Sequence, residues 1–594
     1  MPGLPTATRN GIVTRLSVLS FLLFLSGAYP AMAQRVTGLF LYHSSGQTFM
    51  SWNSAGSGIT SYTVYRSRKP LRTSLALNLA EQVYTVRPGQ ALDKRLTAIL
   101  GRPTYFVFPG PAGKLSSGKE CFVITTVQAA TWYYAVTATD KNGEYRQVHP
   151  GRNAVASGVQ ERAREPHPVH QARLNWKGRT VEVYVHWTTN SGATDYPAMS
   201  NVVSYPFHFA LRKNGRAALH PLHVRLHGRG DHFLDNLDGT GNPQEYILSL
   251  DDELPGSSRS SFWFGYSLGM DIFSKQLPSP PGAIVMDFTQ RRIRWTLRWV
   301  LRTQPIDSTR VYFSGTSMGG SGALFYALSH PEDVAGVAVY VPRLRFHIRD
   351  TLEAPKGKGS MRAADALWGK PEYTPRMTDG RHVYDVLDAV QRFRDSDLRR
   401  FPHVRIIGGS RDSVVGWKQL AAVLRVSDSV RSGLTAFWDA RDHDSRGEHV
   451  WDTQSDASPL FRYRTNRSWP AFSKLSISDI PSDSFVIGML NAAADWFEPV
   501  IDIQDFWSVG IRRVSVDARD TVIVIDADLT ATLTLRRLQR FRVRRGSLYR
   551  CELKDGDAIL FTSIVPAARD GELSIDNLPI PERPATLEIR PVRQ

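Results

Sequence analysis

The chain has 594 residues, of which 42% are hydrophobic and 22% are charged. This is the composition of a globular protein, and it excludes collagen-like, intrinsically disordered and polytopic membrane classes. The formal net charge is +17, but the basic residues are mostly Arg and are spread along the whole chain, so they form no recognisable nucleic-acid-binding motif. We therefore expect no nucleic-acid partner, and at about 100–200 residues per domain the length predicts three to four domains.

The N-terminus has the layout of a secretory signal peptide. Two Arg residues flank the start of an apolar run at 16–28, and the small-residue triplet Ala31-Met32-Ala33 follows it. This arrangement predicts a signal peptide at 1–33 with cleavage after Ala33. The run is too short to span a bilayer, and no other segment reaches about 18 apolar residues. The sequence therefore predicts an exported protein, periplasmic or secreted, without a membrane span.

The two cysteines, Cys121 and Cys551, lie in opposite terminal regions of the chain. Two cysteines in an exported chain of this length do not make a disulfide framework. We interpret them as separate buried thiols rather than as one bridge.

Residues 36–160 carry the pattern of a small β-sandwich. Alternating runs at 48–52, 61–66 and 132–138 are separated by turn residues, which is typical of strands exposed on one face. These runs resemble a fibronectin type III domain, in which 85–130 would be an insertion. The resemblance implies a spacer or binding platform, and we find no residues for chemistry in this segment.

After a polar linker at 161–169 the periodicity changes. Apolar strands are predicted at 179–187, 222–226, 310–313, 334–341 and 404–407, and helices at 291–302, 321–328 and 383–392. Strands that alternate with helices predict an α/β domain at 170–500, with a parallel, doubly wound sheet and a closing helix at 491–497.

From 501 to the end the pattern returns to strands. They are predicted at 521–525, 530–535, 538–543 and 586–589, with turns such as 554–557 between them. The Arg-rich run at 536–545 alternates with apolar residues, which is typical of the outer face of a strand, although a patch for an anionic partner is the alternative. The sequence predicts a second β-sandwich or jelly-roll-like module at 501–594.

The most informative motif is the pentapeptide at 315–319, Gly-Thr-Ser-Met-Gly. A predicted strand leads into it and a small-residue helix follows, as in a nucleophile elbow. Gly315 and Gly319 permit the tight turn and close helix packing, and the turn lifts the Ser317 hydroxyl to the carboxyl edge of the sheet. Gly-x-Ser-x-Gly alone is a weak signal, but both flanking elements are present here. We therefore predict Ser317 as a nucleophile.

A glycine loop, His-Gly-Arg-Gly at 227–230, follows the predicted strand at 222–226. Such a loop can direct a backbone N–H at a developing oxyanion, and the second donor would be the N–H of Met318, the residue after the nucleophile. We expect Arg229 to be the loop donor, with Gly228 as the alternative. An ordinary strand-end turn would explain the same residues without a function.

A serine nucleophile needs a base and an orienting carboxylate, which follow it in the order acid, then His. Asp412 comes in the loop after the strand at 404–407, and His443 comes shortly after the apolar run at 434–438. We predict Asp412 as the acid and His443 as the base. The alternatives are His449 for the base and Asp439 or Asp442 for the acid.

The elbow, the glycine loop and the segment Pro-Glu-Asp-Val-Ala-Gly at 331–336 resemble the α/β-hydrolase superfamily. The closest group is the secreted esterases, namely esterase D, feruloyl esterases and polyhydroxyalkanoate depolymerases. The resemblance covers the central third to half of the chain. It implies an α/β-hydrolase sheet, flanked here by an N-terminal and a C-terminal β-sandwich-like domain.

The same resemblance implies a mechanism. Ser317 would be acylated, His443 would act as general base and then acid, and Asp412 would hold the imidazole tautomer. Backbone amides near Arg229 and Met318 would bind the oxyanion, water would be the final acceptor, and no metal or organic cofactor would be needed.

The leading hypothesis is an exported serine ester hydrolase whose β modules position it on a polymer, such as a polysaccharide ester or a polyester. A peptidase of prolyl-oligopeptidase type is the alternative, but about 130 residues before the catalytic part cannot build its β-propeller. A non-catalytic binding or adhesion protein on a hydrolase scaffold is a third possibility. The aromatic run at 262–266 lines a substrate cleft or, as we prefer, packs in the core.

Overall fold

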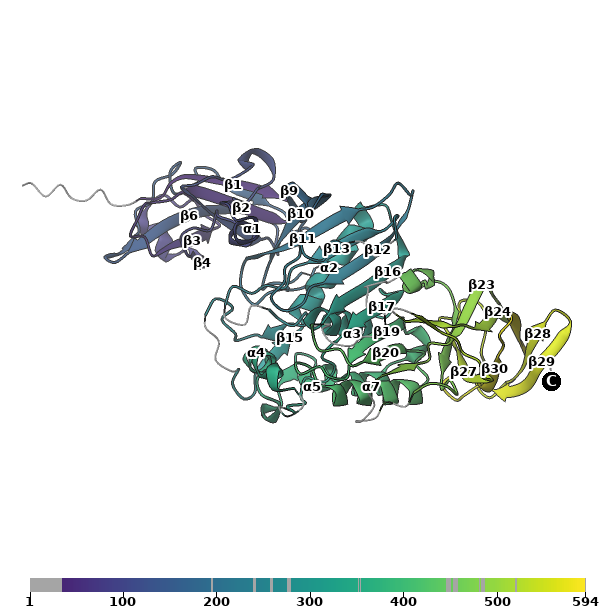
Figure 1. Ribbon diagram of the computed structural model, residues 1–594. Helices are drawn as coiled ribbons and strands as arrows, with labels where there is room; N and C mark the ends of the chain where they lie inside the picture. The colour runs from purple at the N-terminus through teal and green to yellow at the C-terminus, as the bar shows by residue number, and fades with distance from the viewer. Residues whose placement is uncertain are drawn as a thin grey trace, which may run out of the picture.

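A computed structural model describes residues 35–592 of the chain except 194–195, 239–241, 257–259, 275–278, 351, 353, 445–449, 452–457, 480, 482–486 and 519–520. The expected signal peptide at 1–33 therefore lies outside the described residues. Figure 1 shows a β-rich N-terminal part, a central part built on one large sheet, and a β-rich C-terminal part at the opposite end from the first. Among the described residues, no helix is both long enough and apolar enough to cross a membrane.

The N-terminal part consists of two sheets that enclose a hydrophobic core containing Trp52, Tyr62 and Tyr134. One sheet has the order β1-β2-β5 and the other has the order β4-β3-β6-β7, with β8 paired to β6. The strands are β1 (Thr37–Ser44), β2 (Gln47–Asn53), β3 (Ser61–Ser67), β4 (Glu81–Val86), β5 (Lys119–Thr125), β6 (Ala130–Asp140), β7 (Gly143–Tyr145) and β8 (Val159–Glu161).

The segment expected as an insertion, 85–130, is in part a member of the sandwich. Its strand β5 pairs antiparallel with β2 along the whole length of that strand, so this stretch belongs to the sheet and that expectation was wrong for it. The rest of the segment contains helix α1 (Lys94–Leu100). Leu96 of this helix packs in one cluster with Val181 and Val183 of the central sheet.

The central sheet has ten strands in the order β22-β20-β19-β17-β16-β12-β13-β11-β10-β9. The six strands from β20 to β13 are parallel, whereas β11, β10, β9 and β22 pair with their neighbours in antiparallel fashion at the two edges. The expected all-parallel sheet is therefore mixed. Its strands are β9 (Val169–Trp176), β10 (Arg179–Thr188), β11 (Tyr205–Lys213), β12 (His220–Leu226), β13 (Tyr246–Leu250), β16 (Ile306–Thr316), β17 (Gly336–Tyr340), β19 (His403–Gly409), β20 (Thr435–Asp439) and β22 (Gly488–Leu490).

Helices of the central part cover one face of this sheet. Alternate strand residues such as Val224, Phe313 and Val339 share a single core with these helices. They are α2 (Phe288–Thr303), α3 (Met318–Ser329), α4 (Lys358–Trp368), α5 (Val383–Val386), α6 (Ala389–Asp395) and α7 (Trp417–Ser429). A small sheet of β14 (Tyr266–Ser267), β15 (Ile284–Met286) and β18 (Arg376–Met377) lies beside them.

The opposite face of the sheet is covered by the two β-rich parts. Tyr312 and Ile407 point into the core of the C-terminal part, and Val185 and Trp187 pack against the N-terminal part. The expectation of a doubly wound sheet, with helices on both faces, was wrong. The flanking modules occupy the face that a second helix layer would cover.

The C-terminal part contains three sheets. Their strands are β21 (Trp469–Ser473), β27 (Leu529–Arg536) and β30 (Ser574–Ile580); β23 (Ala494–Ile503), β24 (Phe506–Arg513), β31 (Ala585–Pro591), β28 (Leu548–Asp555) and β29 (Ala558–Pro566); and β25 (Val516–Ala518) with β26 (Thr521–Ile523). The closing helix expected at 491–497 was wrong, because most of that stretch is the start of β23. The pairing of β21 with β27 also brings residues before 500 into this part.

The Arg-rich run at 536–545 does not form the outer face of a strand. Strand β27 ends at Arg536, and 537–547 is not a strand. Arg536 and Arg537 are both buried. Arg537 donates hydrogen bonds to the backbone carbonyls of Phe401, Pro331 and Val334 in the central part, so this pair ties the two parts together.

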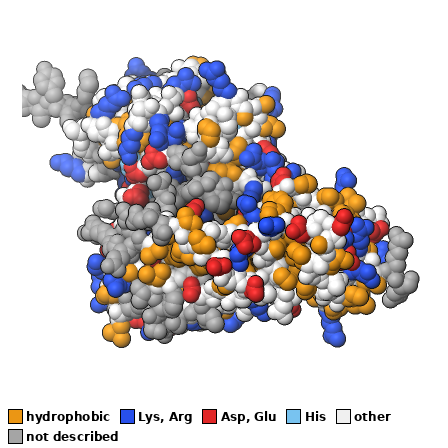
Figure 2. Space-filling model, turned by 45° about the vertical axis from the view of Figure 1, so that its right-hand side comes forward, with side chains coloured by type: hydrophobic (Ala, Val, Ile, Leu, Met, Phe, Trp, Pro, Cys, Tyr) orange, Lys and Arg blue, Asp and Glu red, His pale blue; other side chains and the backbone are white. Residues whose placement is uncertain are grey.

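Both cysteines are buried free thiols, Cys121 in the N-terminal part and Cys551 in the C-terminal part, as the sequence predicts. Short 3-10 helices complete the fold: η1 (Ser74–Asn78), η2 (Gly110–Ala112), η3 (Pro355–Gly357), η4 (Pro371–Tyr373), η5 (Leu398–Arg400) and η6 (Ser458–Arg462). On the face drawn in Figure 2, Lys and Arg side chains are scattered among acidic and apolar ones.

Candidate active site

Ser317 occupies a sharp turn between β16 and α3. Its backbone has φ 55° and ψ −118°, a strained conformation for a residue with a side chain. The turn is held because the Ser317 N–H donates to the carbonyl of Tyr340 at the end of β17, at 2.8 Å, while its own carbonyl accepts from Ser321, at 3.0 Å from the backbone N–H and 3.1 Å from Oγ. The serine is therefore fixed at the carboxyl edge of the sheet.

Two glycines allow this turn to lie close to its neighbours. A Cβ atom on Gly319 would lie 1.9 Å from the carbonyl oxygen of Leu226, at the end of β12. A Cβ atom on Gly315 would lie 2.3 Å from the carbonyl carbon of Gly319. Because real Cβ contacts are never this short, the elbow tolerates only glycine at both positions.

The three predicted catalytic side chains meet at this turn. Nε2 of His443 lies 2.7 Å from Oγ of Ser317, and Nδ1 of His443 lies 2.7 Å from Oδ2 of Asp412. An ionised carboxylate can only accept a hydrogen bond, so Nδ1 carries the proton and Nε2 is left as an acceptor for the serine hydroxyl. The arrangement can move a proton from Ser317 to His443.

Asp412 is held rigidly in the loop after β19. Its side chain is buried, and Oδ1 accepts the backbone N–H groups of Val414 and Val415 at 2.8 and 2.9 Å. Arg343 donates to the Val414 carbonyl at 2.9 Å. With Oδ1 occupied by these donors, Oδ2 remains directed at His443.

The rival acids have other partners. Asp439 is fully buried in an ion pair with Arg441, and it also accepts the N–H groups of Val450 and Trp451. It therefore anchors the loop that carries His443. Asp442 accepts the N–H of Asp444 at 3.0 Å. The rival base, His449, lies outside the described residues.

The predicted oxyanion donors lie on one cavity of about 1090 Å³, which Arg229, Gly230 and Met318 help to line. Met318 is the first residue of α3, and the first N–H groups of a helix have no acceptor within it. The cavity is also lined by Arg95 and Glu253. Sequence reasoning missed both, because Arg95 comes from the N-terminal part and no local motif links it to the site.

The aromatic run at 262–266 packs in the core, as preferred from the sequence: Phe262, Trp263, Phe264 and Tyr266 are all buried. Asp252 organises the start of the run, because it accepts the N–H groups of Ser261 and Trp263 at 3.0 and 2.8 Å. The Trp263 indole in turn donates to the carbonyl of His227.

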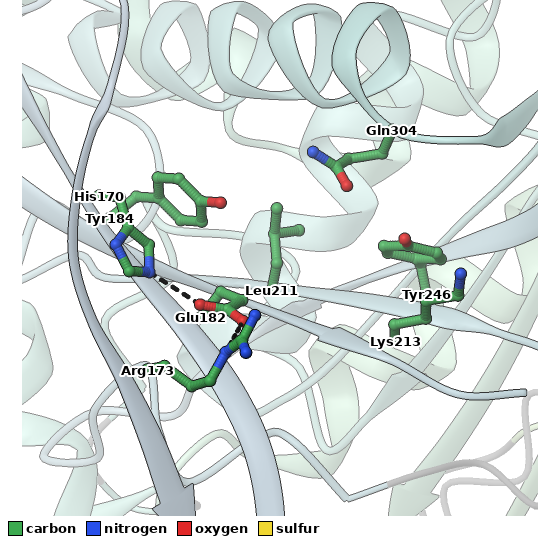
Figure 3. A pocket seen from close by; sticks show the side chains of 8 residues that line it. All are labelled: His170, Arg173, Glu182, Tyr184, Leu211, Lys213, Tyr246 and Gln304. Carbon is green, nitrogen blue, oxygen red and sulfur yellow. Dashed lines mark hydrogen bonds and ion pairs between the residues drawn. The ribbon is translucent and has the colours of Figure 1, made fainter.

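A second cavity, of about 650 Å³, lies near the antiparallel edge of the central sheet. Figure 3 shows Tyr184 and Tyr246 on its two sides, with Glu182 bonded to both His170 and Arg173. This cavity shares no lining residue with the cavity beside Met318, so the two are separate.

One group of side chains in the described part of the chain has the spacing of a metal site, namely His330, Glu332 and Asp333. Arg294 pairs with both carboxylates, at 2.6 Å from Glu332 and 2.9 Å from Asp333. The cation of Arg294 therefore already neutralises charge on these carboxylates.

Comparison with known proteins adds one family match. Residues 288–455, which include Ser317, Asp412 and His443, match the model of the family described as "Putative esterase". No curated protein matches the chain.

Several solved structures are similar to part of the chain. An S-formylglutathione hydrolase from Agrobacterium tumefaciens is 16% identical, with a TM-score of 0.32 over 46% of this chain and 92% of its own. Fluorophosphonate-binding serine hydrolase F from Staphylococcus aureus is 10% identical, with a TM-score of 0.30 over 47% and 95%. Carboxyl esterase 2 from Tuber melanosporum is 15% identical, with a TM-score of 0.30 over 45% and 79%. Identities and TM-scores this low transfer no activity to this chain.

Proposed function

We propose that this protein is a serine hydrolase that cleaves carboxylic esters through an acyl-serine intermediate. The observation that carries the proposal is the unbroken hydrogen-bond line from Ser317 through His443 to Asp412, with 2.7 Å at each step. The match of residues 288–455 to an esterase family model supports the ester as substrate.

In the first half-reaction, Oγ of Ser317 attacks the ester carbonyl carbon while Nε2 of His443 takes its proton. The tetrahedral intermediate collapses when the imidazolium returns that proton to the leaving alcohol, which yields the acyl-serine. Asp412 keeps the imidazole in the productive tautomer and stabilises the imidazolium.

In the second half-reaction, His443 takes a proton from water, and the hydroxide attacks the acyl carbon. The second tetrahedral intermediate releases the carboxylic acid, and His443 returns the proton to Ser317. In both steps the oxyanion is stabilised by the backbone N–H groups of Met318 and of Arg229, each worth about 10²–10³-fold in kcat on the scale of known oxyanion donors.

We also propose that the chain is exported through cleavage after Ala33, and that its flanking β-rich parts hold it on a polymeric ester. The N-terminal part, proposed as fibronectin type III-like, would then be a docking module. Mass spectrometry of the N-terminal peptide, from protein recovered outside the cytoplasm, tests the export; the expected first residue is Gln34, free or cyclised to pyroglutamate.

The ester proposal is tested with p-nitrophenyl esters of increasing acyl length beside matched p-nitroanilides. An ester hydrolase turns over the esters and leaves the anilides intact. Preferential cleavage of the anilides would support the peptidase alternative, and no turnover of either by a folded protein would support the binding-protein alternative.

A further inference from the structure

Helix α1 comes from the N-terminal part of the chain but is anchored on the central part. The two carboxylate oxygens of its N-cap residue, Asp93, have different partners. Oδ1 accepts the N–H of Leu96 and caps the helix, while Oδ2 lies 2.7 Å from Nε2 of His208 in the central sheet. Both Asp93 and His208 are buried. The start of the helix is therefore fixed to strand β11.

Arg95, two residues further along the chain, binds the side chain of Asp251, which directly follows the neighbouring strand β13. Its Nε and Nη2 atoms each donate to a different oxygen of Asp251 at 2.7 Å, which is the bidentate geometry that gives Arg–carboxylate pairs their directionality. Its remaining nitrogen pairs with Glu253. The side chain of Asp251 is only 4% exposed, so this carboxylate is shielded from water.

Asp251 also contacts the glycine loop at 227–230. Its Oδ1 lies 3.3 Å from Nε2 of His227, the first residue of that loop. Nδ1 donates to the carbonyl oxygen of Gly228 at 2.8 Å, since a carbonyl can only accept. Burial lowers the pKa of His227, but the Asp251 carboxylate outweighs this and raises the pKa above its usual value. In the resulting imidazolium Nε2 also carries a proton and donates to Asp251, whereas in the neutral ring Nε2 accepts the Asp252 N–H at 3.1 Å instead. The buried imidazole therefore joins the end of β13 to the backbone of the loop.

Trp263 and Asp231 also contact the loop backbone near this point, and the Gly228 carbonyl accepts the Asp231 N–H at 3.4 Å. The Trp263 indole donates to the His227 carbonyl at 3.0 Å, and its ring packs edge-on against the imidazole. The residues that follow, Arg229 and Gly230, line the cavity beside Met318. A shift of the His227 ring moves Gly228 directly and Arg229 with it.

The charge on Asp251 is stable in this setting. Burial alone would raise the pKa of the carboxyl, but hydrogen bonds from His227 and Arg95 hold it well below its usual range. Arg292 adds a further donor on the same residue, from Nη1 to the Asp251 carbonyl at 2.6 Å. Removal of Arg95 would leave a buried carboxylate without its bidentate partner, which such a group tolerates poorly.

We propose that Arg95 is a positioning residue for acyl transfer, through which the N-terminal part of the chain fixes the oxyanion loop by the relay Arg95–Asp251–His227. This inference rests on the proposed ester hydrolysis. It makes helix α1 a part of the active-site structure rather than of a spacer module.

The relay acts on the oxyanion donors, which matter most once negative charge develops in the transition state. Loss of Arg95 should therefore lower kcat and leave KM nearly unchanged. A displacement of about 1 Å in a positioned group can cost about 10²-fold, so the Arg95→Ala variant of the full chain should lose about 10- to 100-fold in kcat on p-nitrophenyl acetate. Asp251→Asn should lose a similar factor, and the double variant should lose little more than either single one.

A matched control lies in the same part of the chain. Arg66 binds Glu81 with the same bidentate geometry, at 2.8 Å for both contacts, but this pair lies on β3 and the strand next to it, outside the relay. Arg66→Ala should keep the kcat of the parent.

The outcomes separate the inference from the function on which it rests. A folded Arg95→Ala protein with the parent's kcat, or with a raised KM alone, would overturn the relay while the esterase proposal stands. A parent that neither hydrolyses esters nor reacts with a fluorophosphonate would overturn both. If Arg95→Ala does not fold, the kcat of Arg95→Lys tests the relay instead. Lys keeps the positive charge but cannot make the bidentate contact with Asp251, so a kcat equal to the parent's would refute the relay.

Discussion

Nδ1 of His443 lies 2.7 Å from Oδ2 of Asp412, and this contact decides which nitrogen of the imidazole faces Ser317 as an acceptor. The other oxygen of Asp412 is occupied by two backbone N–H groups. The carboxylate therefore cannot turn away from the histidine without breaking these bonds.

Asp412→Asn should inactivate the protein without unfolding it. An amide at this position can donate to Nδ1, which favours the wrong tautomer, and the equivalent change in a serine protease triad costs about 10⁴-fold in kcat. Initial rates on p-nitrophenyl acetate measure the loss. Asp442→Asn is the control, with an expected change below about tenfold; a larger loss for Asp442 than for Asp412 would reverse the assignment of the acid.

Gly319→Ala should disrupt the elbow by sterics alone. The added Cβ would meet the carbonyl oxygen of Leu226 at 1.9 Å, so α3 must move away from β12 and take Ser317 and Met318 with it. We expect a loss of about 10²-fold or more in kcat and a destabilisation of about 1–3 kcal/mol. Gly269→Ala, where nothing lies within 4 Å of the new Cβ, should change neither rate nor melting temperature. Equal behaviour of the two variants would contradict the close packing of the elbow.

His186 should make stability depend on pH. It is buried and stacks on Trp295 with ring centroids 3.9 Å apart, and burial, with a smaller effect of the Arg292 charge, lowers its pKa to about 3. The unfolded chain takes up this proton near pH 6.5 but the folded chain does not. Stability is therefore lost as the pH falls from about 6.5 towards 3, by up to about 1.4 kcal/mol per pH unit.

His186→Phe keeps a stacked ring and removes this proton. The difference in unfolding free energy between the variant and the parent should grow in favour of the variant between pH 7 and pH 5, as followed by urea denaturation. A difference that does not change with pH would show that His186 titrates in the folded protein as it does in the unfolded chain.

Arg537→Ala should loosen the C-terminal part. Its guanidinium donates to three backbone carbonyls of the central part, and a hydrogen bond that involves a charged group contributes about 1.5–3 kcal/mol. We expect a destabilisation of at least about 2 kcal/mol by chemical denaturation. Arg540→Ala, at an exposed neighbouring position, should be neutral. A neutral Arg537→Ala would mean that the apolar contacts alone hold the two parts together.

Much of the local structure was predictable because it is encoded in short stretches. One run of glycines and apolar residues predicts the strand, turn and helix around Ser317. The order of the serine, the acid and the histidine along the chain follows from the sheet topology. Strand β19 and helix α2 likewise lie where the periodicity places them.

The errors came from interactions between distant segments. The stretch at 491–497 has a helical pattern, yet most of it enters β23, because the antiparallel partner β24 is available to it. The arginines at 536 and 537 look exposed in sequence, but they are buried since their partners are carbonyls and a carboxylate more than 30 residues away. Arg95 and Asp251 are 156 residues apart in the sequence, and no local sequence pattern predicts their contact.

The most direct test of the central claim is labelling of the full chain with a fluorophosphonate probe, with Ser317→Ala beside it. The probe reacts only with an activated serine, so no knowledge of the natural substrate is needed. We predict that the parent is labelled at Ser317, and that the variant is unlabelled and loses about 10⁶-fold in ester turnover while keeping the parent's melting temperature. Labelling of both proteins, or of neither when both are folded, would contradict the assignment of Ser317 as the nucleophile.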